Sequence, residues 1–314
     1  MYRLLADVLN DTAFILDCLS PTFPKPVRVV ILSFSSVLRA LCGVAAGSAK
    51  ASLSAHFAKR DNLGELNAKD SSQETVISLL GMLAGSLVVS WITTPMATWT
   101  TLILLLSIHL ETNRRAVRAV RMRTLNRQRA TLVFHHLRRG HVPTPEEVSK
   151  QEHIFERDGV LRSSTGGVLG YCNIGSSLSR LLKVYGTQHA ATNSTSIPED
   201  VVPTLISLYK DQGYILWSTG KGTQRRFEIA LKISAMVSDP LIAWWQTLLL
   251  AEQAEPRQEA EKPMSPAEFE VFGTTLNAAA DLLAQYRDSL IDAGWVLNTT
   301  ALETRASTRL AADG

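Results

Sequence analysis

Cysteine is scarce in this sequence, and no metal-binding spacing accompanies it. The 314 residues contain three cysteines, Cys18, Cys42 and Cys172, which lie far apart. An odd number leaves one thiol over after any pairing, and there is neither a CxxC motif nor a Cys/His cluster with zinc-ligand spacing. We therefore expect reduced, structural cysteines, and we predict no metal site and no cofactor.

Patterns that identify enzymes are also missing. Segments 165–175 and 219–223 look like phosphate loops, but neither matches GxxxxGK[ST]. The second segment contains Lys221, and we favour a plain hairpin turn there over an anion site. No Ser/His/Asp or Cys/His pattern for nucleophilic catalysis stands out, so we predict a non-enzymatic protein. The net charge of +3 is too small to indicate binding to nucleic acid.

The N-terminal sequence does not fit a targeting peptide. Asp7, Asp11 and Asp17 lie inside its first apolar run, which neither a secretory signal nor an Arg-rich transit peptide would tolerate well. At ~100° per residue these aspartates and Asn10 share one arc, so residues 1–19 predict an amphipathic helix. The prolines that follow end this helix. Because the chain opens directly in a helical pattern, we expect part of the domain to precede residue 1.

Charged side chains are absent from residues 75–110, in a chain that is 46% hydrophobic and only 19% charged. A spanning helix needs about 20 apolar residues, and Thr93-Thr94-Pro95 divides this run in two. We predict a membrane-embedded helical hairpin, whose second arm, Met96–Leu110, is short for a full passage. A third candidate span, Val29–Ala49, is interrupted only by Arg39. The N-terminal half thus predicts a multi-pass membrane protein.

A run of arginines follows the predicted hairpin. Residues 111–141 contain nine arginines and a single acidic residue, Glu111, in a sequence otherwise compatible with a helix. Arginines beside a membrane span set its orientation through the positive-inside bias, and they are attracted to anionic lipid. We therefore predict that this end of the hairpin and the domain after it face the cytosol.

The second half of the chain has the hydropathy of an ordinary soluble domain. Thr144–Glu147 is typical of a capping box that starts a helix ending near Phe155. Tyr214–Trp217 and Phe227–Leu231 predict a β-hairpin. Two further helices are expected at 241–252 and 267–293, separated by an acidic linker at 254–266.

The predicted fold class is mainly α. A helical transmembrane bundle occupies residues 1–132, and a smaller α+β soluble domain with a β-hairpin occupies residues 133–314. We expect the tail after Thr304 to be disordered.

Polar residues in the helical half are the candidate functional ones. The aspartate stripe is either the water-facing side of an interfacial helix, which we favour, or a buried site with Arg39 as the natural partner. The segment at 56–74 is either a solvated loop that caps the next helix through Ser71–Glu74, or an anion site near a helix N-terminus. The candidate ligand-binding residues are Asp7, Asn10, Asp11, Arg39, Lys59, Arg60, Lys69, Asp70, Gln73 and Glu74.

Glycines at four-residue spacing mark candidate helix-packing positions. In lipid, helices associate through small residues that let backbones approach closely. These positions are Gly43, Gly47, Gly81 and Gly85. We favour packing within the chain over a dimer interface or a substrate path.

Several segments resemble the root UVB sensitive family, whose shared region is described as a vitamin B6 photo-protection and homoeostasis domain. In order along the chain they are 3–11, 19–21, 68–75 and 113–129, followed by shorter matches at 213–216 and 294–295. Two features depart from the family: its members usually carry a further stretch ahead of the first motif, and a glycine where this chain has Ser71. The resemblance implies a membrane-associated protein linked, in plants, to vitamin B6 homeostasis and to early root development under ultraviolet light. It supplies no catalytic residues.

We therefore predict a non-enzymatic integral membrane protein that handles or senses a small anionic metabolite such as a B6 vitamer. The expected partners are the lipid bilayer, a small anionic ligand, and other copies or family members in an oligomer. The alternative is a membrane-anchored scaffold whose soluble domain recruits a pyridoxal-phosphate-dependent enzyme or another partner.

Overall fold

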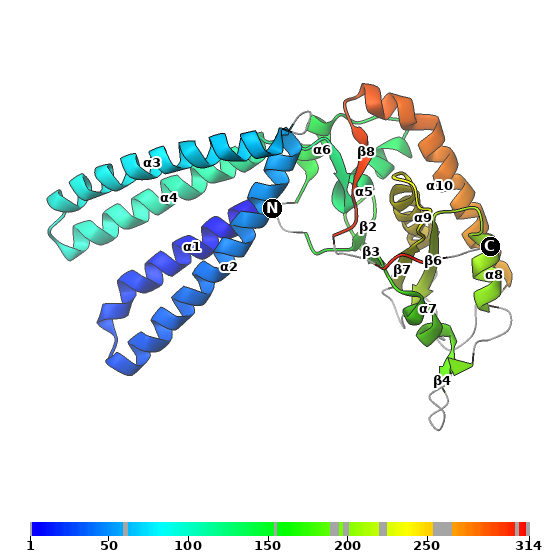
Figure 1. Ribbon diagram of the computed structural model, residues 1–314, viewed down its shortest axis with the longest axis horizontal. Coiled ribbons are helices and arrows are strands. Elements are labelled where there is room, and N and C mark those ends of the chain that lie inside the picture. Colours follow the sequence, from blue (N-terminus) through cyan, green and yellow to red (C-terminus); the bar gives the residue numbers. More distant parts are fainter. Residues whose placement is uncertain are drawn as a thin grey trace. The chain divides into compact units, whose positions relative to one another are not determined.

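The chain divides into two compact units, Met1–Val120 and Arg121–Gly314, which we describe separately. The computed structural model describes residues 2–58, 62–153, 156–188, 195–196, 201–219, 225–253, 266–304 and 308–311 (Figure 1). The division falls earlier than the boundary predicted at residue 132. Residues 121–132 lie in the second unit because Leu125 and Ala130 are buried in its core.

The first unit is helical. Its elements are α1 (Tyr2–Leu19), the 3₁₀ turn η1 (Ser20–Thr22), α2 (Lys25–Phe57), α3 (Leu63–Trp91) and α4 (Pro95–Ala119). The α1 helix ends before Pro21, as the proline cluster predicts, and α2 restarts the helix with Pro26 in its first turn, where no backbone N–H is needed. In Figure 1, α1 and α2 form an antiparallel pair, and the two helices are in extensive contact.

The α3 helix begins earlier than the sequence predicts. It starts at Leu63, so Ser71–Glu74 lies inside the helix and does not cap it. Glu65 and Lys69 form an i,i+4 ion pair there, with Lys69 Nζ 2.6 Å from Glu65 Oε1, which supports helix rather than loop. The predicted solvated loop is therefore mostly the polar start of a long helix. The predicted break at Thr93–Pro95 is confirmed: Ala97 N–H donates to Thr94 Oγ1, and Pro95 opens α4.

The long helices of the first unit leave most of their apolar side chains exposed. Neither α3 nor α4 has a buried residue, and α2 buries only a few small side chains and Leu38. By length and composition α2 and α3 could cross a membrane, with mean hydropathies of 2.0 and 1.5. Within the described residues α4 does not reach the same threshold, so only one arm of the predicted hairpin passes this test.

The second unit is built on a four-stranded sheet with the order β2-β3-β7-β6. The β3–β7 pair is parallel, and both outer pairs are antiparallel. The predicted hairpin is confirmed as β6–β7, with Tyr214 opposite Leu231 and Leu216 opposite Ile229. The strands are β2 (Val160–Arg162), β3 (Val168–Ile174), β6 (Tyr214–Thr219) and β7 (Arg225–Leu231).

Two short pairs complete the strands. The β1 strand (Thr124–Asn126) pairs in parallel with β8 (Val296–Ala301), which brings residues from both ends of the unit together. The antiparallel pair β4–β5 joins Thr187–Gln188 to Thr195–Ser196.

The central helix of the second unit is α9 (Asp239–Gln253), which covers the predicted helix at 241–252. It contacts every strand of the four-stranded sheet and packs against α5 and α10. Trp244 and Trp245 are fully buried, and their indole N–H groups donate to Thr131 Oγ1 at 2.9 Å and Ala130 O at 3.0 Å. The other helices are α5 (Arg127–Leu137), α6 (Pro145–Gln151), α7 (Leu178–Tyr185), α8 (Val201–Leu208) and α10 (Pro266–Asp292).

Two local sequence features shape the backbone of this unit. Thr144 and Glu147 form the capping box that starts α6, although the helix ends at Gln151, before the predicted Phe155. Gly213, just before β6, has no room for a side chain, because a Cβ would overlap Asp239 Oδ2 and Ala235 Cα.

The arginine run belongs largely to the second unit. The helix compatible with it breaks after Ala119, and Arg127 and Arg129 are buried in α5. Arg129 Nε donates to Glu152 Oε1 at 2.7 Å, and its Nη1 donates to Thr124 O at 2.8 Å. These two arginines therefore hold the fold together and do not face lipid.

Part of the C-terminal tail is ordered against the sheet, where the sequence predicts disorder. Leu310 N–H donates to Leu231 O at 2.9 Å, and Ile233 N–H donates to Leu310 O at 2.9 Å. The tail thus continues the hydrogen bonding of β7 at its end. The predicted acidic linker lies almost entirely outside the described residues.

Candidate functional site

Two buried carboxyl groups lie on α1 where it packs against α4. Asp7 and Asp11 are one helical turn apart and only 9% and 4% exposed. His109 Nδ1 on α4 lies 3.1 Å from Asp11 Oδ2, and Asn113 Nδ2 lies 2.8 Å from His109 Nε2. The four side chains form a polar cluster between two helices, which we call the Asp–His cluster.

The Asp–His cluster is incompletely hydrogen-bonded. Asp7 Oδ2 and Asp11 Oδ1 are buried and have no hydrogen-bond partner among the described residues. A buried carboxylate without partners is costly, and a bound proton or cation removes that cost. The described part of the chain contains no group of three or more His, Cys, Asp or Glu side chains that could hold a metal ion.

The favoured interpretation of the aspartate stripe was wrong for Asp7 and Asp11, which do not face water. A different side of α1 carries Ala6 and Ala13, which are fully buried, and small side chains allow close packing against neighbouring helices. Ser35 Oγ on α2 donates to Ala13 O at 3.1 Å and fixes this contact.

Arg39 is not the partner of the buried pair. It forms an ion pair with Asp17, in which both side chains are partly exposed. Asn10, the remaining candidate on α1, is half-buried.

The charged candidates near the start of α3 form ion pairs with neighbouring side chains of opposite charge. Lys69 pairs with Glu65. Asp70 and Glu74 both bind Lys50 Nζ on α2, at 2.9 and 2.7 Å. Gln73 is exposed. Lys59 and Arg60 lie outside the described residues, so these contacts neither test nor support an anion site there.

Sequence reasoning missed two residues of this region. His109 is the one histidine in the uncharged run 75–110, and that isolation was the available signal. Lys50 closes the apolar stretch of α2, opposite the acidic start of α3.

The four glycines predicted to pack helices together have no neighbouring atoms close to them among the described residues. A Cβ added at Gly43, Gly47, Gly81 or Gly85 would meet no atom within 4 Å. The favoured interpretation, packing within the chain, therefore finds no support there.

The glycine-containing segment 165–175 does not form a phosphate loop. Its backbone N–H groups already have protein acceptors: Gly166 donates to Ser163 O, Gly167 to Ser163 Oγ and Gly175 to Ile229 O. The three cysteines are free thiols, and Cys172 is buried.

The first half of the chain is similar in sequence to known proteins. Residues 1–140 match the vitamin B6 photo-protection and homoeostasis domain. The chain is 40% identical over 159 residues to RUS family member 1 of Dictyostelium discoideum, a match that covers 49% of this chain and 30% of that protein. It is 38% identical over 157 residues to protein root UVB sensitive 3 of Arabidopsis thaliana, covering 49% of this chain and 36% of that protein.

A weaker likeness extends over most of the chain. Protein root UVB sensitive 5 of Arabidopsis thaliana is 21% identical over 312 residues, which is 96% of this chain and 56% of that protein. No solved structure gives a significant match. The matches above span about a third to a little over half of the relatives' own length.

Fold and comparison together define a helical domain with a buried carboxyl cluster, followed by an α+β unit. The helical domain lies within the match to the vitamin B6 photo-protection and homoeostasis domain, so the resemblance to root UVB sensitive proteins inferred from residues 3–11, 68–75 and 113–129 is confirmed.

Proposed function

We propose that the first unit is embedded in a membrane and couples proton binding at the Asp–His cluster to the handling of a small metabolite related to vitamin B6. The observation that carries this proposal is the pair of buried carboxyl groups with unpartnered oxygens. In membrane proteins, ionisable side chains facing a helix bundle mark substrate or proton paths.

The exposed apolar surface supports the membrane part of this proposal. Side chains of Val30, Val44, Ile77, Leu83 and Val89 are each more than half exposed. Contiguous apolar surface of this kind is rare in soluble monomers and is satisfied by lipid or by a partner. The arginines at the end of α4 support an orientation in which the second unit faces the cytosol.

The metabolite in this proposal is a small anion, and the protein acts without enzymatic chemistry. A carboxylate cluster repels an anion, so binding of the anion is favoured when Asp11 or His109 has taken up a proton. The proton and the anion then each favour binding of the other, and this cooperativity is required for transport of an anion together with a proton.

Uptake into liposomes tests this proposal. The full chain is reconstituted, and uptake of labelled pyridoxal and pyridoxal 5′-phosphate is followed with and without an inward proton gradient. We expect gradient-dependent uptake by the unsubstituted chain and at least tenfold less by Asp11→Asn, which keeps the shape but cannot take up a proton. The matched control, Asp281→Asn, makes the same change at an exposed position of α10 and should stay within twofold.

Two results would overturn the proposal. One is uptake that Asp11→Asn leaves unchanged; the other is no uptake by a chain shown to be folded and inserted. The second result would favour a membrane-anchored scaffold, whose second unit recruits a pyridoxal-phosphate-dependent enzyme or another partner. The observation that favours such a scaffold is the exposed loop before α9, where Ile233 and Met236 are each 70% exposed.

A further inference from the structure

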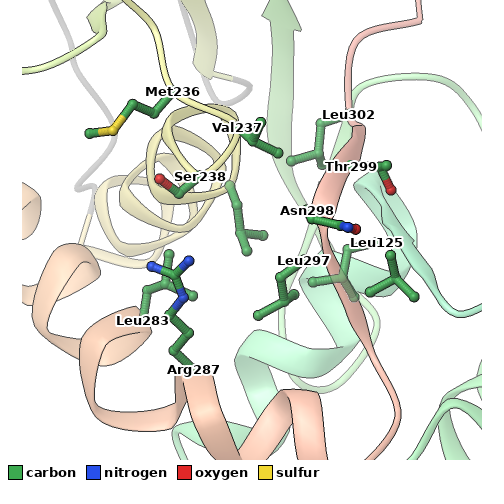
Figure 2. Close-up of a pocket in the computed structure, with 12 residues that line it drawn as sticks. Leu125, Met236, Val237, Ser238, Leu283, Arg287, Leu297, Asn298, Thr299 and Leu302 are labelled. Atoms are coloured by element: carbon green, nitrogen blue, oxygen red, sulfur yellow. The ribbon is translucent and has the colours of Figure 1, made fainter.

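The second unit contains a pocket that is lined by its own residues. Figure 2 shows it between β8, the second half of α10 and the loop that leads into α9. Its volume is about 280 Å³. Apolar side chains form most of its wall: Leu125, Val237, Leu241, Leu283, Val296 and Leu302.

One cationic side chain lines this apolar pocket. Arg287 lies one turn after Leu283 on the same face of α10, and in Figure 2 its guanidinium group extends beside Leu283 toward Ser238. Among the residues that the structure describes, no carboxylate forms an ion pair with Arg287. The nearby Asp239 is buried, and its Oδ2 accepts a hydrogen bond from Met236 N–H at 2.7 Å, so this acid is engaged elsewhere.

Arg287 and the apolar wall of the pocket together favour one class of ligand. A guanidinium group pairs with a planar carboxylate or a phosphate through two parallel hydrogen bonds. The surrounding leucine and valine side chains favour a compact apolar body. Since one water occupies about 30 Å³ of liquid, the pocket holds a body on the order of ten non-hydrogen atoms.

We propose that this pocket binds a small organic acid, with its apolar body against Leu241 and Leu283 and its acid group on Arg287. This site lies in the second unit and does not depend on the Asp–His cluster. Ser238 lies on the same side of the pocket as Arg287, and its hydroxyl can donate a further hydrogen bond to the acid group (Figure 2).

Fluorine NMR of two ligands of equal shape provides the test. The full chain in detergent micelles is titrated with para-fluorobenzoate and with its neutral isostere, para-fluorobenzamide, and empty micelles correct for partitioning. We expect the acid to bind at least tenfold more tightly than the amide. Arg287→Gln should weaken binding of the acid at least fivefold and leave the amide unchanged, and Arg287→Lys, which keeps the charge but not the two parallel N–H donors, should bind the acid with an affinity between those of the unsubstituted chain and of Arg287→Gln.

Lys183→Gln is the matched control, because it removes one positive charge from an exposed position on α7. It should leave both ligands unaffected. Equal binding of acid and amide would overturn the proposal, as would an Arg287→Gln variant that binds the acid like the unsubstituted chain. If Arg287→Gln unfolds, Arg287→Lys decides: affinity for the acid equal to that of the unsubstituted chain contradicts the assigned guanidinium pairing.

Discussion

Replacing Arg127 with methionine should destabilise the second unit by about 3 kcal/mol. The Arg127 side chain is only 9% exposed. Its Nε donates to Leu302 O at 2.8 Å, and its Nη1 donates to Asp158 Oδ1 at 2.7 Å. The guanidinium carbon also lies 5.8 Å from the centre of the Trp244 ring. Arg127 thus links the start of α5 to two distant segments of the unit.

The magnitude follows from these contacts. A hydrogen bond to a charged group contributes roughly 1.5 to 3 kcal/mol. The bond to Asp158 counts at the low end of that range, because the Asp158 side chain is 46% exposed and water can replace Arg127. The cation–π contact adds about 0.5 to 1 kcal/mol. Methionine retains the apolar stem and recovers part of the loss, which leaves a net cost near 3 kcal/mol.

Urea unfolding followed by tryptophan emission measures this cost. The second unit contains Trp217, Trp244, Trp245 and Trp295, all at most 2% exposed. Replacing Trp91 and Trp99 with phenylalanine makes the emission report on this unit alone. Arg118→Met is the control, because Arg118 is exposed on α4 and its loss should change stability by less than about 0.5 kcal/mol. Equal effects of the two substitutions, or a loss below about 1 kcal/mol for Arg127→Met, would refute the assigned role.

Two further predictions concern titration and thiol reactivity. Burial lowers the pKa of His135 below its usual 6.5, so the unfolded chain takes up a proton that the folded chain does not. The free energy of unfolding should therefore fall as pH drops below about 6.5. The urea midpoints measured at pH about 7.5 and about 5.5 should differ less in His135→Gln than in the unsubstituted chain. Burial raises the pKa of the Cys172 thiol to about 12, so maleimide should label it only on unfolding. In vesicles, a membrane-impermeant maleimide should label the exposed Cys18 but not Cys42 in α2; labelling of Cys42 in intact vesicles would contradict the proposed membrane embedding.

Local signals explain what the sequence predicted well. The break at Thr93–Pro95, the capping box at Thr144 and the β6–β7 hairpin each depend on neighbouring residues, so a short window contains the information. The start of α3 was missed because Ser71–Glu74 has the composition of a cap. Helix propensity and the Glu65–Lys69 pair nevertheless carry the helix through it.

Features that depend on distant partners were not predictable in the same way. The pairing of Thr124 with Val296, the burial of Arg127 and the pocket at Arg287 all need residues that are far apart in the sequence. In the candidate site, the sequence identified Asp7 and Asp11 but gave no means of finding which helix covers them. The contact with His109 on α4 supplies that information, and it reverses the expectation that these acids face water.

The contrast between α9 and α3 is the strongest physical argument for a membrane around the first unit. Both helices are apolar, but α9 is enclosed by the sheet, α5 and α10 and buries Trp244 and Trp245 completely. The α3 helix buries no residue, so side chains such as Ile77 and Leu83, each more than 60% exposed, gain nothing from folding in water. Lipid stabilises such a helix without any packing partner, whereas a protein partner would have to cover nearly its whole circumference. Labelling of Cys42 in vesicles that contain the purified chain alone separates these two cases, since lipid is then the cover of this thiol and no other protein is present to protect it.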